Sequence, residues 1–358
     1  QLPLADSHRA WAVALTLLAA YTLTMARDLS AFDSPELALA AYGLGLGHPP
    51  GQPLHLLLAH AFAQAPGVSA LFAMNLLSAV AGALCILPAW SLAETLLGRE
   101  RLVPIWIALV FVPIGLHPLL WESATRIEVY SLASFFCLWA IARVAVPERA
   151  RDLGYAGIAL GLGACANPYL SVIAALALAP GLLVAVVRRR IALRAIPRAV
   201  AGGCIGLLPY LYVPWAASRE YVPGVLVWGR PNDPDSLRRY FLGLDYARSR
   251  GITAPEWMSH VVDWCAWAWD RGVLALLITG LFGVLLAERR SLLLTAAALG
   301  STLLGVSLIA SNTLWQPDIP DYLGYLVLAG WIAGAGVVAL LARANEIGRW
   351  RASCWSTT

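Results

Sequence analysis

Long apolar runs, many of them the length of a membrane-spanning helix, dominate this chain of 358 residues. Hydrophobic residues make up 59% of it and charged residues only 13%, whereas soluble domains carry about 25% charged residues. A soluble fold of this length cannot bury so much apolar side chain, so lipid is the solvent for most of the chain. The sequence therefore predicts an all-α, polytopic integral membrane protein with about ten transmembrane helices in a single transmembrane domain over residues 1–358.

The predicted spans are separated by charged segments or by Pro and Gly. They are residues 10–26, 69–97, 102–120, 128–146, 154–166, 168–187, 197–217, 272–287, 292–311 and 322–342. The run 154–166 is short for a hydrocarbon core of about 30 Å, and Pro168 is expected to break the helix between it and the next run. The run 10–26 has no small-residue cleavage site after it, so it is interpreted as a first span rather than a signal peptide.

The placement of arginine gives an orientation. All 25 basic residues are Arg, and most of them fall on one side of the membrane if the N-terminus is cytoplasmic, whereas most of the 21 acidic residues fall on the other side. Cytoplasmic loops carry the excess of positive charge in membrane proteins. This predicts cytoplasmic N- and C-termini. The exclusive use of Arg is also a compositional hint of a GC-rich genome, hence of a bacterial inner membrane.

Two outer segments are too long to be simple turns. The first covers residues 27–68, and the second covers residues 218–271 and is rich in Trp, Tyr, Pro, Asp and Arg. Long ordered loops in compact proteins are usually functional. We expect the second segment to fold over the outer face, with a helix through residues 255–270 that lies in the membrane plane and carries several of its Trp rings.

The remaining composition excludes other classes. The net charge of +4 is spread over many loops, so no basic face is available for nucleic acid. The six cysteines form no CxxC pair, and they are expected to be small buried hydrophobic residues.

A first candidate motif, Asp33-Ser34-Pro35-Glu36, lies just after the first span. One interpretation is structural: Asp33 or Ser34 caps a helix, Pro35 occupies its first turn and Glu36 completes a capping box. The other is catalytic: a carboxylate at the membrane surface, its pKa raised by burial, acts as a general base. The two interpretations are compatible.

A second motif, Gly-His-Pro-Pro-Gly-Gln-Pro, begins at Gly47 and forms a stiff, sharply turned loop. His48 lies at its entry, and His55 and His60 follow. Three histidines without a recognised ligand spacing do not predict a zinc site. The loop is instead a candidate wall of a cavity beside Asp33.

Two further clusters lie at outer helix ends. The stretch around Arg126, Glu128 and Tyr130 is either an interfacial belt with a local Arg–Glu pair or a site where the guanidinium binds an anionic group such as phosphate. The loop 312–321 brings Asp318 and Asp321 to the same surface. Acidic loops are often only solvated.

Together these segments resemble the family called domain of unknown function 2723, the transmembrane protein 260-like protein O-mannosyltransferases of the glycosyltransferase-C superfamily. The similarity covers most of residues 10–340. It is carried by FDSPELALAAYGLGLGHPPGQPLHLLLAHAF, MNLLSAVAGAL, ESATRIEVYSLASFF, GLGACANPYLSVIAALALAP, LPYLYVPWAASREYVPGVLVWGRPNDPDSLRRYFLG and DIPDYLGYLVLAG.

The resemblance implies a glycosyltransferase-C-like fold with outer-face loop helices and a catalytic acid in the first outer loop. It makes Asp33 the base candidate with Glu36 beside it, and it places His48, Arg126, Glu128, Tyr130 and Asp321 around the substrate. Pro35, Gln52 and Pro168, which follows Asn167, depart from residues common at these positions of the family.

The implied function is transfer of a sugar, with mannose as a candidate, from a polyprenyl-phosphate donor to a hydroxyl on a protein or glycan at the extracytoplasmic side. Membrane lipids and other membrane subunits are candidate partners, and Mg²⁺ or Mn²⁺ is a candidate cofactor whose ligands the sequence does not identify. The alternative is a non-catalytic structural subunit of a larger membrane complex. A transporter is a third hypothesis, disfavoured because the spans are nearly free of charge.

Overall fold

The computed structural model describes residues 7–97, 104–145, 150–188, 191–219, 224–244, 251–287, 291–312, 316 and 319–355. Over these residues the chain is helical, and its β-structure is an isolated parallel bridge between Leu46 and Val227. The all-α prediction is confirmed.

The first half of the chain contributes α1 (Ser7–Thr24), α2 (Ser34–Tyr42), α3 (Pro53–Ala63), α4 (Ala70–Leu84), α5 (Ile86–Leu97), α6 (Pro104–Gly115), α7 (Pro118–Ala124), α8 (Tyr130–Ala145) and α9 (Ala150–Ala166). The second half contributes α10 (Pro168–Val187), η2 (Leu193–Ala195), α11 (Ile196–Gly206), η3 (Leu208–Leu211), α12 (Tyr212–Ser218), α13 (Pro234–Phe241), α14 (Ala254–Asp270), α15 (Val273–Leu286), α16 (Leu292–Ala310), α17 (Pro320–Leu323), η5 (Gly324–Leu326) and α18 (Val327–Trp355).

Several helices are long and apolar enough to cross a membrane. Five helical segments of the described chain meet this criterion, and the pair α14–α15, bent by 88°, makes a sixth if it is one span. The five are Ala70–Leu97, Pro168–Val187, Leu193–Ser218, Leu292–Ala310 and Asp321–Asn345. The chain is therefore an integral membrane protein, as predicted.

Each of the ten predicted apolar runs contains helix, but the count of about ten spans stays a prediction. The run at 154–166 belongs to α9, which starts earlier, at Ala150, and has 17 residues. The expected break at Pro168 is confirmed, because α9 ends at Ala166 and α10 begins at Pro168. The Asn167 side chain caps the new helix by accepting a hydrogen bond from the Leu170 amide.

Glycine allows two helix pairs to pack with their backbones in contact. Between α9 and α11, a Cβ added to Gly202 would lie 2.1 Å from the carbonyl oxygen of Gly154. Between α15 and α18, a Cβ on Gly283 would lie 1.8 Å from the carbonyl oxygen of Gly336. Small residues let membrane helices approach closely, where van der Waals packing holds them together.

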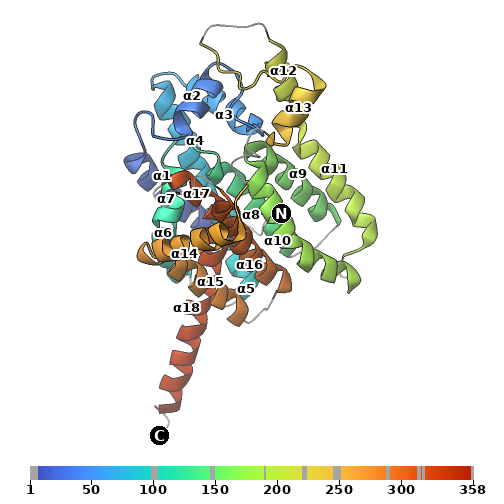
Figure 1. The fold of residues 1–358 in the computed structure, drawn as a ribbon. Coiled ribbons are helices and arrows are strands. Elements are labelled where there is room, and N and C mark those ends of the chain that lie inside the picture. Colours follow the sequence, from blue (N-terminus) through green and yellow to red (C-terminus); the bar gives the residue numbers. More distant parts are fainter. Residues whose placement is uncertain are drawn as a thin grey trace.

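Helices α2, α3 and α13 of the two outer segments gather at one end of the bundle together with α12, whereas α14 lies apart from them beside α15 and α16 (Figure 1). In Figure 1, α2, α3, α12 and α13 lie at the end opposite to the C-terminal end of α18. The helix expected at 255–270 is present as α14, begun by a capping box between Thr253 and Glu256. Of its Trp rings, Trp264 is buried and Trp269 is 66% exposed.

The cysteine prediction is only partly right. Cys85, Cys137 and Cys165 are buried, but Cys204 is exposed on α11 and Cys265 is half-buried on α14. An apolar run in a membrane protein faces lipid as well as the core, so apolar surroundings in the sequence do not imply burial within one chain. The side chain of Cys354 lies outside the described residues.

Candidate functional site

Asp33 directly precedes α2, but its side chain does not cap the helix. The predicted capping box is therefore wrong: Asp33 has helical backbone angles, which turn its carboxylate away from the free amides of the first turn, and Glu36 is engaged elsewhere. The preceding residue, Phe32, has φ of +65°, a conformation that is uncommon for a residue with a bulky side chain. This turn leaves the Asp33 carboxylate available for chemistry.

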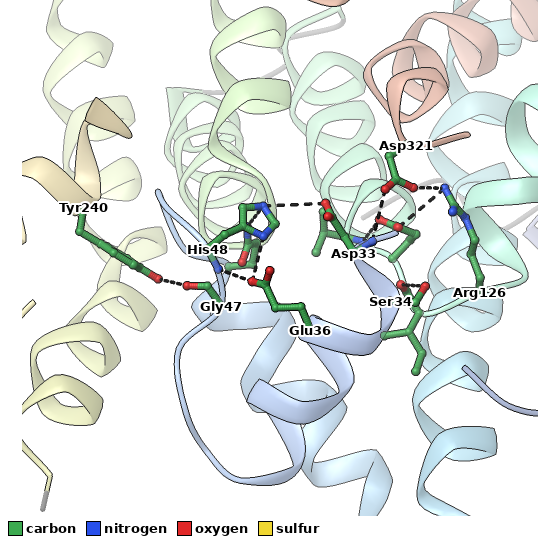
Figure 2. A network of polar contacts seen from close by, with 12 residues as sticks. Asp33, Ser34, Glu36, Gly47, His48, Arg126, Tyr240 and Asp321 are labelled. Atoms are coloured by element: carbon green, nitrogen blue, oxygen red, sulfur yellow. Dashed lines mark hydrogen bonds and ion pairs between the residues drawn. The ribbon is translucent and has the colours of Figure 1, made fainter. Parts of the chain in front are cut away.

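The backbone around Asp33 is held by two distant segments. The Asp33 amide donates to Oδ2 of Asp321 at 3.4 Å, and the Ser34 hydroxyl donates to the carbonyl of Ile127 at 2.9 Å. Ser34 is fully buried. These contacts join the first turn of α2 to the loop before α8 and to the start of α17, as Figure 2 shows.

His48 lies between two carboxylates. Its Nδ1 is 3.0 Å from Oε1 of Glu36, which also accepts a hydrogen bond from the His48 amide, and its Nε2 is 3.9 Å from Oδ2 of Asp33. The Gln52 side-chain nitrogen is 3.2 Å from the same Nε2. Figure 2 shows the ring between Glu36 and Asp33. Glu36 thus orients the histidine instead of capping α2.

The loop that carries His48 is fixed by the second outer segment. The Tyr240 hydroxyl donates to the carbonyl of Gly47 at 2.7 Å, and the Leu46 amide donates to the carbonyl of Leu226 at 2.8 Å. Gly51 has φ of +81°, and a Cβ there would lie 2.8 Å from the Tyr240 oxygen, so this turn requires glycine. The second segment packs against the first.

Arg126 lies on the other side of Asp33 and is 8% exposed. Its guanidinium donates to Oδ1 of Asp321 and lies 3.7 Å from Oε1 of Glu128. Glu128 is 1% exposed. The predicted Arg–Glu pair is present, and Asp321 joins it. Arg126 therefore balances two buried carboxylates, one of which binds the backbone of the candidate base.

A small cavity of about 40 Å³ opens beside the Asp33 carboxylate. A cavity of this size holds a few water molecules or the end of a hydroxyl-bearing side chain. Its lining residues come from the first outer segment and from the outer ends of α8, α10 and η5: Asp33, Leu37, His48, Pro50, Gln52, Val129, Tyr130, Asn167, Pro168, Tyr169 and Tyr325.

The surroundings raise the pKa of both central groups, Asp33 and His48. Burial raises the pKa of Asp33, and Asp321 and Glu36 raise it further, while His48 and Arg126 oppose this. Burial lowers the pKa of His48, but the hydrogen bond to Glu36 and the charge of Asp33 outweigh burial, so the pKa of His48 is raised. A carboxylate with a raised pKa is a stronger base, and an imidazole with a raised pKa holds a proton more firmly.

Glu128 is the most deeply buried acid of the cluster. Burial raises its pKa well above the ordinary value, and the neighbouring charge of Asp321 adds to this, while Arg126 lowers it. Two carboxylates that share one cation in a buried site cannot both ionise freely.

The structure brings all seven predicted site residues into one connected region. Asp33, His48 and Tyr130 line the cavity, Glu36 binds His48, and Arg126, Glu128 and Asp321 form the charged cluster behind Asp33. Asp318 lies outside the described residues.

Sequence reasoning gave no site role to Gln52, Tyr169, Tyr240 or Tyr325. The signal that was available for Tyr169 and Tyr325 is their position near the outer start of a predicted span, shortly after a proline. No group of three or more His, Cys, Asp or Glu side chains arranged to hold a metal ion occurs among the described residues.

The chain is similar to known proteins in this region. Residues 33–190 match the family described as the protein O-mannosyl-transferase TMEM260 N-terminal domain. The protein O-mannosyl-transferase TMEM260 of Mus musculus is 32% identical over 216 residues, which cover 57% of this chain and 29% of the mouse protein. The chain thus spans less than a third of the length of that relative.

The fold is also similar to that of a solved structure. ArnT from Cupriavidus metallidurans bound to undecaprenyl phosphate aligns with a TM-score of 0.58 at 14% identity, covering 94% of this chain and 60% of ArnT. The same enzyme in the apo state aligns with a TM-score of 0.42 at 13% identity, covering 92% of this chain and 75% of ArnT. The first alignment shows that the chain has the fold of ArnT.

The resemblance predicted from the sequence is confirmed by these comparisons. The matched stretch contains every predicted site residue except Asp321, which binds the backbone of Asp33 from the start of α17. Residues 33–190 of this integral membrane protein are thus similar to the TMEM260 N-terminal domain family.

Proposed function

We propose that this chain is a membrane glycosyltransferase that moves a sugar, with mannose as the candidate, from a polyprenyl-phosphate donor to a hydroxyl on a protein or glycan. The observation that carries the proposal is the Asp33 carboxylate, which lines a cavity, makes no capping bond and has a raised pKa. A general base requires these properties, since it must reach the substrate proton and bind it strongly.

The proposed reaction is a single displacement. Asp33 accepts the proton of the acceptor hydroxyl as that oxygen forms a bond to the anomeric carbon of the sugar. The bond from the anomeric carbon to the phosphate oxygen breaks, and the phosphate leaves with the electron pair. The products are the glycosylated acceptor, a polyprenyl phosphate and a protonated Asp33.

The setting of the site and the relatives support the proposed donor class. A soluble nucleotide sugar has no need of a lipid-embedded enzyme, whereas a polyprenyl-phosphate sugar cannot leave the membrane. ArnT is a protein of the same fold that has been solved with undecaprenyl phosphate bound, and the mouse relative is named a protein O-mannosyl-transferase. These similarities support the proposed donor and the proposed sugar.

The neighbouring residues have distinct proposed roles. Asp321 and Arg126 hold the backbone of Asp33 in place, and Glu36 orients His48. Tyr130 forms part of the cavity wall that the substrate contacts. Binding of the donor phosphate by Arg126 stays a prediction, in competition with the ion pairs to Asp321 and Glu128.

We place the protein in a bacterial inner membrane because it uses only Arg as a basic residue. We place both termini in the cytoplasm and the site on the outer face because of the distribution of these arginines. In this orientation α14 lies in the plane of the outer interface, since it meets α15 at an angle of 88°. Participation of Mg²⁺ or Mn²⁺ stays a prediction, and transfer measured with a chelator and after restoring each ion tests it. The proposed steps use only side chains of the chain.

The test is sugar transfer from radiolabelled polyprenyl-phosphate mannose to a pool of Ser- and Thr-containing peptides by the purified full chain in liposomes. Asp33→Asn removes the base at constant size, so we expect the rate of transfer to fall by roughly two to four orders of magnitude. Asp28→Asn is the matched control, because Asp28 is exposed in the same loop and its carboxylate accepts a hydrogen bond from the adjacent Leu29 amide.

Undiminished transfer by the Asp33→Asn variant would remove Asp33 as the base. Absence of transfer by the wild-type chain would favour the alternative of a non-catalytic subunit. In that case mutations on surfaces that face a partner, rather than at Asp33, should disturb assembly of the complex.

A further inference from the structure

We propose that His48 is the second proton acceptor of this site, which takes the acceptor's proton from Asp33 through Nε2, and that Gln52 switches its amide to accommodate it. The inference rests on the proposed transferase function. It gives His48 a role in proton transfer, beyond its place in the cavity wall.

The Nδ1 side of the ring is set for this role. Glu36 accepts hydrogen bonds from the His48 amide and from Nδ1, the latter at 3.0 Å. A carboxylate accepts only, so Nδ1 carries the hydrogen and the lone pair of a neutral His48 lies on Nε2. Nε2 is the ring nitrogen nearer Asp33, at 3.9 Å from Oδ2. The carboxylate of Glu36 also stabilises the imidazolium that forms when Nε2 is protonated.

Gln52 provides an adjustable partner at Nε2. Its amide nitrogen lies 3.2 Å from Nε2 and donates to the lone pair of the neutral ring. The Gln52 side chain is 3% exposed, and its Oε1 is a buried acceptor with no hydrogen-bond partner. An unpaired buried carbonyl costs stability. A half-turn of the Gln52 amide would let Oε1 accept a hydrogen bond from a protonated Nε2. The unpaired carbonyl present with the neutral ring would then be paired when His48 is protonated.

The charged and titratable groups facing His48 favour a proton on the ring. Glu36 on α2, Asp33 before α2 and Asp321 at the start of α17 all contribute negative charge. Arg126 lies behind Asp321 and is paired with it. Tyr130, Tyr169 and Tyr325 also line the cavity. The cation formed at His48 is thus surrounded mainly by carboxylates.

The step balances without a further reactant. After displacement the proton is on Asp33; its O–H bond breaks and an N–H bond forms at Nε2, which restores the Asp33 carboxylate and leaves an imidazolium. The proton then passes to water through the cavity as the products leave. Asp33 is thus already deprotonated when the products leave, and it can accept a proton from the next acceptor hydroxyl.

The first measurement does not need activity. Because the pKa of His48 is raised in the folded protein, the stability it contributes is present below its unfolded pKa of about 6.5 and is lost as pH rises through the folded pKa. His48→Asn keeps a donor in the place of Nδ1 but cannot titrate. We expect thermal stability of the full chain in detergent to fall from pH 6 to pH 8 by more for wild type than for this variant.

The second measurement is transfer from polyprenyl-phosphate mannose as a function of pH. For His48→Asn we expect kcat to fall by roughly 10²-fold, the lower end of acid–base contributions, with KM unchanged. The limb of the wild-type profile that requires neutral His48 should disappear. Gln52→Glu places a carboxylate beside Nε2 and should move that limb up by roughly one pH unit or more. His60→Asn, on α3 with Nδ1 at the Ala41 carbonyl, is the control.

The outcomes separate the two proposals. A stability difference that does not change with pH shows that His48 does not titrate, and it overturns the relay whatever the activity. A pH limb that persists in His48→Asn overturns the relay and leaves the transferase in place. Titration of His48 in a wild-type chain that transfers no sugar overturns the transferase proposal, and the relay falls with it.

Discussion

Replacing Arg126 with Met should lower the free energy of unfolding of this protein, because Arg126 is the cation between two buried acids. Its guanidinium donates to Asp321 and lies 3.7 Å from Glu128, and Glu128 is 1% exposed. At an effective dielectric constant of about 20, a pair at this distance gains on the order of 4 kcal/mol. Removing one partner of a buried ion pair costs about 3–5 kcal/mol.

The assay is the free energy of unfolding in mixed micelles as denaturing detergent is added. Arg126→Met should lower it by about 3–5 kcal/mol. Adding Glu128→Gln to that variant should recover roughly 1–3 kcal/mol, because the two residues are coupled. Arg238→Met is the control: its pair with Asp235 is 2.9 Å long but about two-thirds exposed on both sides, so its loss should cost at most about 1 kcal/mol.

The result also decides what Arg126 is for. If its main role is to bind donor phosphate, Arg126→Met should unfold like wild type and lose only donor affinity. A change in unfolding free energy within about 1 kcal/mol of wild type, the range of exposed pairs, would refute the reasoning from burial.

Three further predictions follow from other parts of the structure. Burial raises the pKa of Asp33, so the ionised carboxylate lowers the stability of the folded protein at neutral pH. In thermal unfolding, Asp33→Asn should therefore be at least as stable as wild type at pH 7. The difference between the two proteins should vanish as the pH falls below 4. Gly202→Ala should destabilise by about 1–3 kcal/mol through overpacking, whereas its neighbour Gly203→Ala, where the new Cβ meets its nearest contact at 3.9 Å, should be neutral or stabilising by up to about 1 kcal/mol. In a cysteine-free background, a thiol at the exposed position Asn232 should react with an impermeant reagent from outside the cell, and one at Ala192 should not; labelling of Ala192 would reverse the proposed orientation.

The membrane class, the helices and a set of residues that the structure brings into one region could be predicted from the sequence. Apolar run length reports on lipid directly, and a break such as Asn167-Pro168 is local, so α9 and α10 end and begin where expected. The capping box at Asp33 could not be judged in this way. Its sequence fits a cap, but Glu36 gains a stronger partner in His48, which lies 12 residues away along the chain. The tertiary contact of Glu36 with His48 is therefore formed in place of the local capping box.

The pairing of Arg126 was equally beyond the sequence. Nothing in the sequence around Arg126 indicates that Asp321, 195 residues later, would take its guanidinium. Gln52 was noted only as a departure from the family, although its burial beside His48 makes it a central part of the site. Contacts between distant outer segments depend on how the helices pack, and composition or spacing does not report on that.

The hydrogen bond between Asp321 and the Asp33 amide has a consequence for biogenesis. Asp33 is made near the start of the chain, but the carboxylate that holds it is made almost 300 residues later, at the entry to the last long helix. Tyr240, which holds the His48 loop, also lies beyond residue 190. A nascent or truncated chain that contains only the matched stretch would insert its helices and carry the base, yet lack these two anchors. The site is therefore completed only when α17 and α18 take their places, so a partly synthesised chain would lack the anchored first turn of α2.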